Sequence, residues 1–379
     1  MNRPSVHVCV ATGQNLANLI PALQLGARTV AILETPGMQS SAANLKAALE
    51  THGISVTRMP FDDSTPEAIV RSASDAAERL GEQALVFNAT GGHKLMILAL
   101  TEEMKVADEL HLLYTETRYD RLDWLKPQAQ VEPMEDVLKL DDILFAQGYR
   151  RLSDSERDGH WQRAAVERET LTRRLGDDAD KLAKFFGTLN ALADQALENE
   201  PDGPFWAQQE FDYAPGGANA DVLHIAQKLN LLQWDGDSEI VFSSPETAAY
   251  FRGGWLEEYV WLKLRGLKPR DWSVNLKIET VGGKTENQLD AVVVHRNRML
   301  AIECKTGRFG RDAPKDADYI YKLAQLSRQV GGILSGSLLL SAHPVSEQVR
   351  VRAKECQVDI VAAAGIKRLV PYLRDWMNS

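Results

Sequence analysis

The chain has 379 residues, a formal net charge of −10 and 44% hydrophobic residues. This length suits two or three domains with ample buried cores, and no apolar run approaches the roughly 18 residues of a membrane span. The three cysteines have no close spacing, which argues against a disulfide framework or a zinc site. We therefore expect a cytoplasmic protein without membrane contact. Its charge argues against a general nucleic-acid binder, but not against an enzyme with a local basic groove.

Residues 5–125 alternate between short apolar segments and helix-like stretches. The segments that predict strands are residues 6–11, 29–34, 55–61, 84–88 and 109–116. Strands that alternate with helices of roughly 10 to 15 residues predict a parallel sheet with helices on both faces. Gly53 and Gly81 end two of the helices, because glycine accepts the left-handed C-cap conformation. We expect a Rossmann-like domain over residues 1–135.

Polar turns follow two of these strands, at their carboxyl ends, where open α/β sheets bind ligands. Gly91 and Gly92 let backbone amides approach a phosphate, and the N-terminus of the next helix favours an anion, to which Lys94 adds positive charge. The candidate ligand-binding residues are Thr12, Gly13, Gln14, Asn15, Asn18, Thr90, Gly91, Gly92, His93 and Lys94. Neither turn has the spacing of a GxGxxG or Walker A loop, so a nicotinamide or ATP enzyme is disfavoured. Turns that only connect strand to helix are the alternative.

Residues 136–248 predict a mostly helical and highly charged segment. A helix over residues 220–232 is followed by a hairpin-like stretch over residues 233–244. This order suggests a winged-helix-like part. We interpret the segment as a helical connector, whose simplest role is that of a spacer between two working domains.

Residues 249–379 predict an α/β domain with a mixed sheet. A helix over residues 253–266 precedes three strands, and further helices and strands alternate after them. The strands are predicted at residues 273–280, 288–296, 299–305 and 336–342, with a last one from residue 359.

Two acidic residues are expected to converge in this domain. Alternation along the strand MLAIECK places Ile302 and Cys304 on one face, and Glu303 and Lys305 on the other. A hairpin with its turn near residue 297 brings Asp290 across from residue 303 or 304. Asp290 and Glu303 can then bind one Mg²⁺ or Mn²⁺, which polarises a phosphodiester and activates a water. Lys305 can orient that water and offset charge on the phosphate.

Asp290 and the Glu303-Cys304-Lys305 triplet match the PD-(D/E)xK nuclease pattern, although Leu289 stands where the proline is usually written. On the preceding helix, Glu257 shares the packed face with Val260 and Trp261 and is the candidate third metal ligand. Glu258 is expected to point further round towards solvent. We therefore expect a restriction-endonuclease-like domain with Glu257, Asp290, Glu303 and Lys305 as catalytic residues. An ion pair between Glu303 and Lys305 on a sheet surface is the structural alternative.

Lys322, Gln325 and Arg328 recur on one side of a predicted helix. If this helix packs over the sheet, Lys322 and Gln325 lie nearest the site and contact substrate phosphates. A solvated charged face explains the pattern equally well.

The segments ATGQNLANLIP, NATGGHKLM, GGWLEEYVWLKL and LDAVVVHRNRMLAIECKTG together resemble CRISPR-associated nucleases that join a CARF sensor domain to a PD-(D/E)xK domain. This resemblance implies a homodimer whose paired CARF domains bind cyclic tetra-adenylate across the two-fold axis. It also implies that this allosteric activator switches on cleavage of single-stranded RNA or DNA and nicking of duplex DNA.

Two other functions stay open on the sequence alone. One is a repair or restriction nuclease that no cyclic nucleotide gates. The other is a ligand-responsive DNA-binding regulator that works through the middle helices, for which Asp290, Glu303 and Lys305 are only structural.

Overall fold

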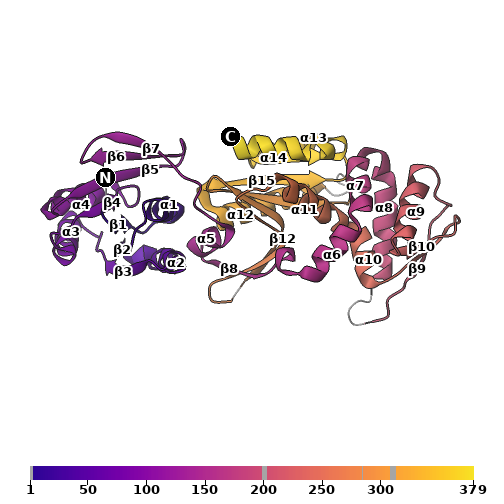
Figure 1. Ribbon diagram of the computed structural model, residues 1–379, viewed down its shortest axis with the longest axis horizontal. Coiled ribbons are helices and arrows are strands. Elements are labelled where there is room, and N and C mark those ends of the chain that lie inside the picture. Colours follow the sequence, from indigo (N-terminus) through magenta and orange to yellow (C-terminus); the bar gives the residue numbers. More distant parts are fainter. Residues whose placement is uncertain (1–2, 199–202, 284, 308–312) are drawn as a thin grey trace.

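The computed structural model describes residues 3–198, 203–283, 285–307 and 313–379, with side chains from residue 318 onward in the last range. Three sheets lie in a row along the long axis of the molecule (Figure 1). The sheet formed by the N-terminal residues lies at one end, the sheet formed by the C-terminal residues lies in the centre, and a small sheet lies at the other end. The order in space therefore differs from the order in the chain.

The N-terminal sheet has the strand order β3-β2-β1-β4-β5-β6-β7. Its first five strands are parallel and confirm the five predicted ones. The antiparallel ribbon of β6 and β7 was not predicted. The bounds are β1 Val6–Val10, β2 Thr29–Glu34, β3 Ser55–Pro60, β4 Leu85–Asn88, β5 Leu110–Glu116, β6 Arg121–Lys126 and β7 Gln130–Pro133.

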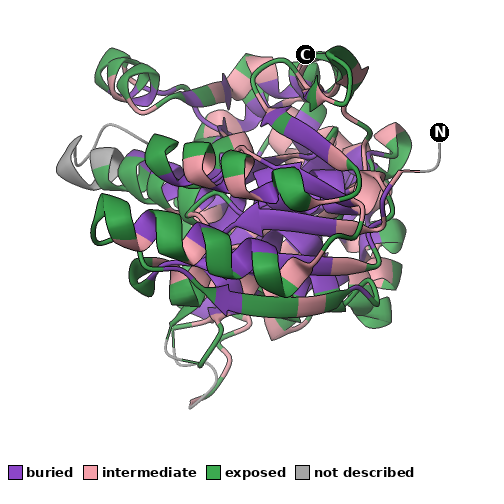
Figure 2. Ribbon diagram, turned by 90° about the vertical axis from the view of Figure 1, so that its left-hand side faces the viewer, coloured by how far each residue is buried: buried purple, intermediate pink, exposed green. Residues whose placement is uncertain are grey.

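Helices cover both faces of the N-terminal sheet, as a Rossmann-like fold requires. Apolar side chains of α1 and α2 pack on one face, and those of α3 and α4 pack on the other. Buried residues accordingly follow the strands, while the outward helix faces are exposed (Figure 2). The bounds are α1 Leu16–Gln24, α2 Gln39–Glu50, α3 Pro66–Leu80 and α4 Lys94–Glu103.

The C-terminal sheet has the order β16-β15-β14-β13-β12-β8 and is mixed, as predicted. Strands β14, β15 and β16 run parallel, and the remaining pairs are antiparallel. One face packs against α11 and α14, and the other against α12 and α13. The bounds are β8 Tyr149–Ser153, α11 Trp255–Leu267, β12 Asp271–Thr280, β13 Glu286–His295, β14 Arg298–Lys305, α12 Ala313–Gly331, β15 Ser335–Ser341, α13 Glu347–Glu355, β16 Val358–Ala362 and α14 Leu369–Asn378.

One strand of this sheet comes from the range assigned above to the connector. Strand β8 pairs with the edge of β12, so residues 149–153 complete the C-terminal sheet. The short helix before it, α5 (Leu140–Ala146), contributes to an apolar core that continues from the helices of the N-terminal sheet to α12. The N-terminal and C-terminal sheets are therefore joined by direct packing.

The middle segment, residues 159–249, lies beyond the C-terminal sheet and not between the two larger sheets (Figure 1). The interpretation as a spacer is therefore wrong. Its small sheet has the order β10-β11-β9, with a helix before the terminal hairpin, which agrees with the predicted winged-helix-like part. The bounds are α6 Gly159–Glu167, α7 Glu169–Asp177, α8 Ala179–Ala196, β9 Gln208–Glu210, α9 Ala218–Lys228, β10 Leu232–Gln233, β11 Glu239–Phe242 and α10 Pro245–Ala249.

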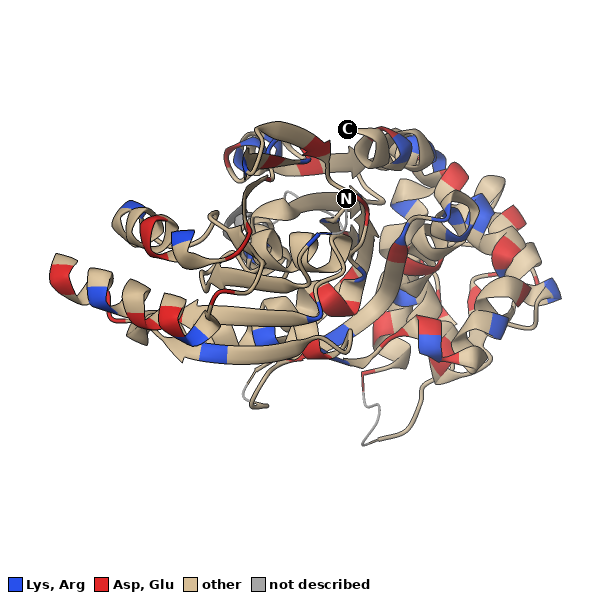
Figure 3. Ribbon diagram, turned by 60° about the vertical axis from the view of Figure 1, so that its left-hand side comes forward, with Lys and Arg blue, Asp and Glu red and all other residues tan. Residues whose placement is uncertain are grey.

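Acidic and basic residues are mixed over the surface elements (Figure 3), in keeping with the moderate net charge. Within the described ranges, no helix has the length and apolar character that crossing a membrane requires.

Candidate functional site

The hairpin of β13 and β14 brings the predicted acidic residues together. Its turn residues Arg296 and Asn297 have φ of 51° and 59°, the left-handed conformation of a tight hairpin turn. Ala291 pairs with Ile302, so Asp290 lies directly opposite Glu303. The backbone N–H of Cys304 donates to Asp290 Oδ2 at 2.8 Å. The predicted hairpin geometry is therefore confirmed.

The regular pleat is interrupted at Asp290. In a regular strand Leu289 and Ala291 share a face, but here they belong to different cores, on opposite sides of the sheet. Opposite Asp290 on β12 stands Asn275, whose φ of 54° breaks the same alternation. Asp290 consequently lies at the point where the side chains of β13 change from one face of the sheet to the other. Only the register between β12 and β13 reveals the part that Asn275 plays, so sequence reasoning missed it.

This position allows Glu257, from helix α11, to approach Asp290. Burial and the charge of Asp290 raise the pKa of Glu257 to about 8, although a hydrogen bond from Asn275 opposes the rise. Burial and the charge of Glu303 raise the pKa of Asp290 to about 6. Both shifts have the same physical cause: like charges are crowded together and partly removed from water. Glu257, Asp290 and Glu303 thus form one electrostatic group.

Lys305 neutralises part of this negative charge. Its Nζ lies 2.5 Å from Glu303 Oε1 and 4.8 Å from the centre of the Tyr319 ring. Burial lowers the pKa of the Lys305 ammonium, but Glu303 and Asp290 outweigh it, so the pKa is raised and the lysine is charged. An ion pair between Glu303 and Lys305, which was the structural alternative to a catalytic role, is therefore present beside the acidic group.

The chemistry of the three carboxylates fits a hard divalent cation. Oxygen donors are the ligands that Mg²⁺ and Mn²⁺ prefer, and the repulsion that raises the pKa of Glu257 and Asp290 is relieved by a cation between them. Among the described residues, no three His, Cys, Asp or Glu side chains are close enough to form a ready-made metal cluster. A metal ion would have to draw Glu257, Asp290 and Glu303 together and compete with Lys305 for Glu303.

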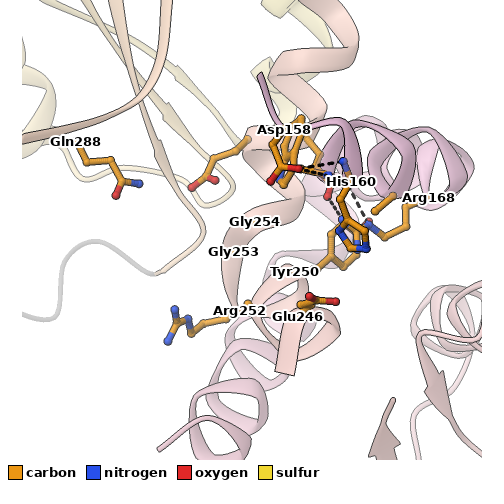
Figure 4. Close-up of a pocket in the computed structure, with 14 residues that line it drawn as sticks. Asp158, His160, Arg168, Glu246, Tyr250, Arg252, Gly253, Gly254 and Gln288 are labelled. Atoms are coloured by element: carbon orange, nitrogen blue, oxygen red, sulfur yellow. Dashed lines mark hydrogen bonds and ion pairs between the residues drawn. The ribbon is translucent and has the colours of Figure 1, made fainter. Parts of the chain in front are cut away.

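Two cavities flank the acidic group and share Gln288. The α6 cavity, of about 490 Å³, is lined by Glu257 and by residues of α6, α10 and the turn Tyr250–Gly254. Figure 4 shows Gln288 on one side of this cavity and Asp158, His160 and Arg168 on the other. The α12 cavity, of about 420 Å³, is lined by Glu303 and by residues of α12. Glu257 and Glu303 therefore line two separate cavities, one on each side of Asp290.

Helix α12 packs over the sheet in the orientation on which the substrate-contact prediction depended. Lys322 and Gln325 line the α12 cavity together with Glu303 and Tyr319. Arg328 instead donates to Gln357 Oε1 at 2.8 Å. The structure thus brings the two favoured residues to the site and directs the third away from it.

Glu258 does not point to solvent, contrary to the prediction. It is 2% exposed and forms a two-pronged ion pair with Arg168 of the middle segment. Thr172 donates to its Oε2 at 3.3 Å. Burial raises the pKa of Glu258, and Arg168 opposes the rise. Helix α11 therefore carries acidic residues on two sides, the half-buried Glu257 towards Asp290 and the buried Glu258 towards the middle segment.

The two polar turns of the N-terminal sheet lie side by side, because β1 pairs with β4. A Cβ added at Gly91 would collide with the Val10 carbonyl oxygen, and Gly92 has a φ of +83°. The Thr90 hydroxyl donates to Asn88 Oδ1 at 2.6 Å and accepts from the Thr115 N–H at 2.7 Å. The glycines thus let the second turn approach Val10 at the end of β1, while Thr90 ties that turn to β5, at the edge where the strand order reverses.

Asn15 and Asn18 have a different geometry from the expected one. Both are buried, at 2% and 4% exposure. Asn15 donates to the carbonyls of Ser41 and Ala146, while Asn18 donates to the Val10 carbonyl and accepts from Asn88. Their amides therefore fix the turns from within and do not face a ligand.

The remaining candidates lie at the surface of the turns. Gly13, Gln14, Gly92, His93 and Lys94 are exposed, and Thr12 is half-buried. Lys94 is the first residue of α4, whose first turn contains no acidic residue. A cation at a helix N-terminus is unfavourable, so this arrangement favours an anion in front of the turn. Gln14 Oε1 also accepts from the Ile333 N–H, at 3.2 Å.

Sequence comparison matches residues 245–379 with the family described as "Card1-like, endonuclease domain". No curated protein matches the chain in sequence. The C-terminal part of the chain is thus similar to an endonuclease domain of the Card1-like kind.

Solved structures resemble the whole chain. Can2 from Sulfobacillus thermosulfidooxidans, in complex with cyclic tetra-adenylate, has a TM-score of 0.79 at 21% identity, over 99% of this chain and 98% of that one. Protein VC1899 from Vibrio cholerae has a TM-score of 0.84 at 21% identity, over 98% of each chain. A type III CRISPR defence DNA nuclease activated by cyclic oligoadenylate has a TM-score of 0.56 at 18% identity, over all of this chain but 52% of its own. The predicted resemblance and fold are confirmed.

Proposed function

We propose that the chain is a divalent-metal-dependent nuclease of type III CRISPR defence, activated by cyclic tetra-adenylate, which cleaves single-stranded RNA or DNA and nicks duplex DNA. One observation carries the proposal: the residues matched by an endonuclease family are those in which Asp290, Glu303 and Lys305 meet. The fold shared with a protein that binds cyclic tetra-adenylate supports the proposed activator.

In the proposed reaction, Asp290, Glu303 and Glu257 would hold a Mg²⁺ or Mn²⁺ ion. Such an ion, when bound, polarises the phosphodiester and lowers the pKa of an attacking water. Lys305 is charged and adjacent to the acidic residues, so it offsets negative charge that develops on the phosphate. Lys322 and Gln325 line the α12 cavity and are suited to hold a neighbouring phosphate.

The proposed activator site is the pair of turns after β1 and β4. Thr12, Gly13, Gln14, Thr90, Gly92, His93 and Lys94 are its accessible residues, with the buried Gly91 beneath them, and we no longer include Asn15 and Asn18 among its contacts. A phosphate in front of Lys94 would pair with its ammonium and with the positive end of α4. This offsets the unfavourable position of the lysine.

A homodimer through helix α4 would complete the activator site. Leu95 and Leu98, one turn apart on this helix, are 54% and 67% exposed, directly after the glycine turn. Large apolar side chains at such exposure suit an interface. In an isologous dimer the turns of both copies would face the same two-fold axis, which suits a symmetric ring of phosphates.

The activator signal would reach the nuclease domain through helix α12. The Gln14–Ile333 hydrogen bond joins the first turn to the 3-10 turn Gly332–Leu334, which directly follows this helix. Tyr319 and Lys322 lie on the same helix, beside Lys305 and Glu303. Activation requires that cyclic tetra-adenylate bind the active arrangement more tightly than the inactive one.

The test is a cleavage assay of the full chain with Mn²⁺, with single-stranded RNA, single-stranded DNA and supercoiled duplex, against a panel of cyclic oligoadenylates. We expect cleavage that depends on cyclic tetra-adenylate and is abolished in Glu303→Ala. Activity indifferent to every activator would favour an ungated repair or restriction nuclease. Undiminished activity in Glu303→Ala would refute the active site.

A further inference from the structure

We infer that Asn190, on helix α8 of the middle segment, is a positioning residue for Lys305. It does not touch the acidic residues. It acts through Thr306, the residue that follows Lys305 where strand β14 ends. The inference rests on the proposed nuclease function and assigns the middle segment a part in that reaction.

The contact between Asn190 and Thr306 is two-pronged. Asn190 Nδ2 donates to the Thr306 carbonyl oxygen at 3.1 Å and to Thr306 Oγ1 at 3.0 Å. The Thr306 hydroxyl in turn donates to the Arg252 carbonyl oxygen at 3.1 Å. Thr306 is buried, at 8% exposure, so its polar atoms depend on these partners. One amide therefore satisfies two acceptors of a single residue.

The position of this contact matters because the sheet no longer holds the chain there. Lys305 is the last residue of β14, and its carbonyl accepts from the Ala342 N–H at 2.8 Å. Beyond it, the bonds from Asn190 and to Arg252 fix the backbone. A Cβ added at Gly253 would lie 2.9 Å from Thr306 Oγ1, so the turn Tyr250–Gly254 approaches Thr306 closely. These contacts determine the direction of the backbone where strand β14 ends at Lys305.

The middle segment also binds Glu258, the residue next to the catalytic candidate Glu257. Arg168 binds Glu258, which follows Glu257, and the Arg168 guanidinium lies 4.7 Å from the centre of the Tyr250 ring. Apolar side chains of α7 and α8 share one core with α11 and with the Cys304 face of β14. The middle segment thus contacts both elements that carry Glu257 and Lys305.

The test compares Asn190→Ala and Thr306→Val with two controls, Thr306→Ser, which keeps the hydroxyl, and Gln195→Ala, which removes an exposed amide from the same helix. Single-turnover and steady-state cleavage are measured at saturating Mn²⁺ and activator. We expect kcat to fall about 10-fold in Asn190→Ala and in Thr306→Val, with KM within about twofold of wild type, since an interaction that serves only the transition state changes kcat. Both controls should retain wild-type kcat.

A double-mutant cycle separates positioning from general damage. Because Asn190 and Thr306 act through one contact, the double variant should lose about 10-fold and not about 100-fold. Hydrogen exchange of the peptide that ends at Thr306 should increase in Asn190→Ala, whether or not substrate is present. A kcat within twofold of wild type in Asn190→Ala, multiplicative losses, or unchanged exchange would overturn the inference. An inactive wild-type chain would instead refute the proposed nuclease function and, with it, this assignment.

Discussion

Binding of a divalent cation to the acidic group should release protons. The pKa of Glu257 is about 8 and that of Asp290 about 6. At pH 7, Glu257 is then roughly nine-tenths protonated and Asp290 about one-tenth, so a metal ion that requires both carboxylates displaces about one proton. Almost all of that proton comes from Glu257.

The sign of the pH dependence follows from the same values. Metal affinity should rise with pH by about 100-fold between pH 6 and pH 8, and level off above pH 8. The stability of the metal-free protein should change in the opposite direction. Both carboxyl groups have a higher pKa in the folded protein than the value of about 4 in an unfolded chain. Protonation of these two groups therefore stabilises the folded state. This contribution is fully present below pH ~4 and is lost as the pH rises to ~8.

Calorimetric titration with Mn²⁺ at pH 7, in buffers of different ionisation enthalpy, counts the protons directly. We expect about one proton per ion for the wild type and about 0.1 for Glu257→Gln, in which only Asp290 titrates. Equal proton release by the two proteins would contradict the assignment of Glu257 to the metal site. Metal affinity that is flat from pH 6 to pH 8 would contradict the crowding of the carboxylates.

Three further predictions concern the supports of the site. Arg168→Ala should destabilise the chain by about 3–5 kcal/mol, because Glu258 loses its partner while buried; a drop below about 1 kcal/mol in chemical denaturation would contradict this. Leu98→Asp should weaken the dimer at least about 10-fold in sedimentation, since it places a charge in the apolar α4 face; an unchanged dimer would place the interface elsewhere. Gln14→Ala should reduce cleavage even at saturating cyclic tetra-adenylate, and wild-type cleavage at saturation would argue against coupling through α12.

The hairpin that carries Asp290 and Glu303 was predictable because its determinants are local. Alternation along residues 299–305 and a polar turn at residue 297 suffice to place Asp290 opposite Glu303. The burial of Glu258 was not predictable, since its partner Arg168 lies 90 residues away in the sequence. Helical periodicity gives the angle of a side chain round its own helix, but not what packs against it.

Strand β8 was missed for a related reason. Its sequence, YRRLS, carries two arginines and looks like a solvated surface. In the fold Arg151 is neutralised by Asp141 at 2.9 Å and Asp154 at 2.6 Å, and Arg150 pairs with Glu279 of the neighbouring strand. The pair with Glu279 forms only once the sheet is assembled. The roles of Asn15 and Asn18 were also predicted wrongly. These polar residues beside a glycine turn were expected to face a ligand, but they donate to backbone carbonyls within the fold.

The most direct test of the account is cleavage of a labelled single strand by the full chain with Mn²⁺, measured with and without cyclic tetra-adenylate, with Glu303→Ala in parallel. We expect cleavage by the wild type only when the activator is present, and no cleavage by the variant under either condition. Equal cleavage with and without the activator, or cleavage by Glu303→Ala at the wild-type rate, would contradict it.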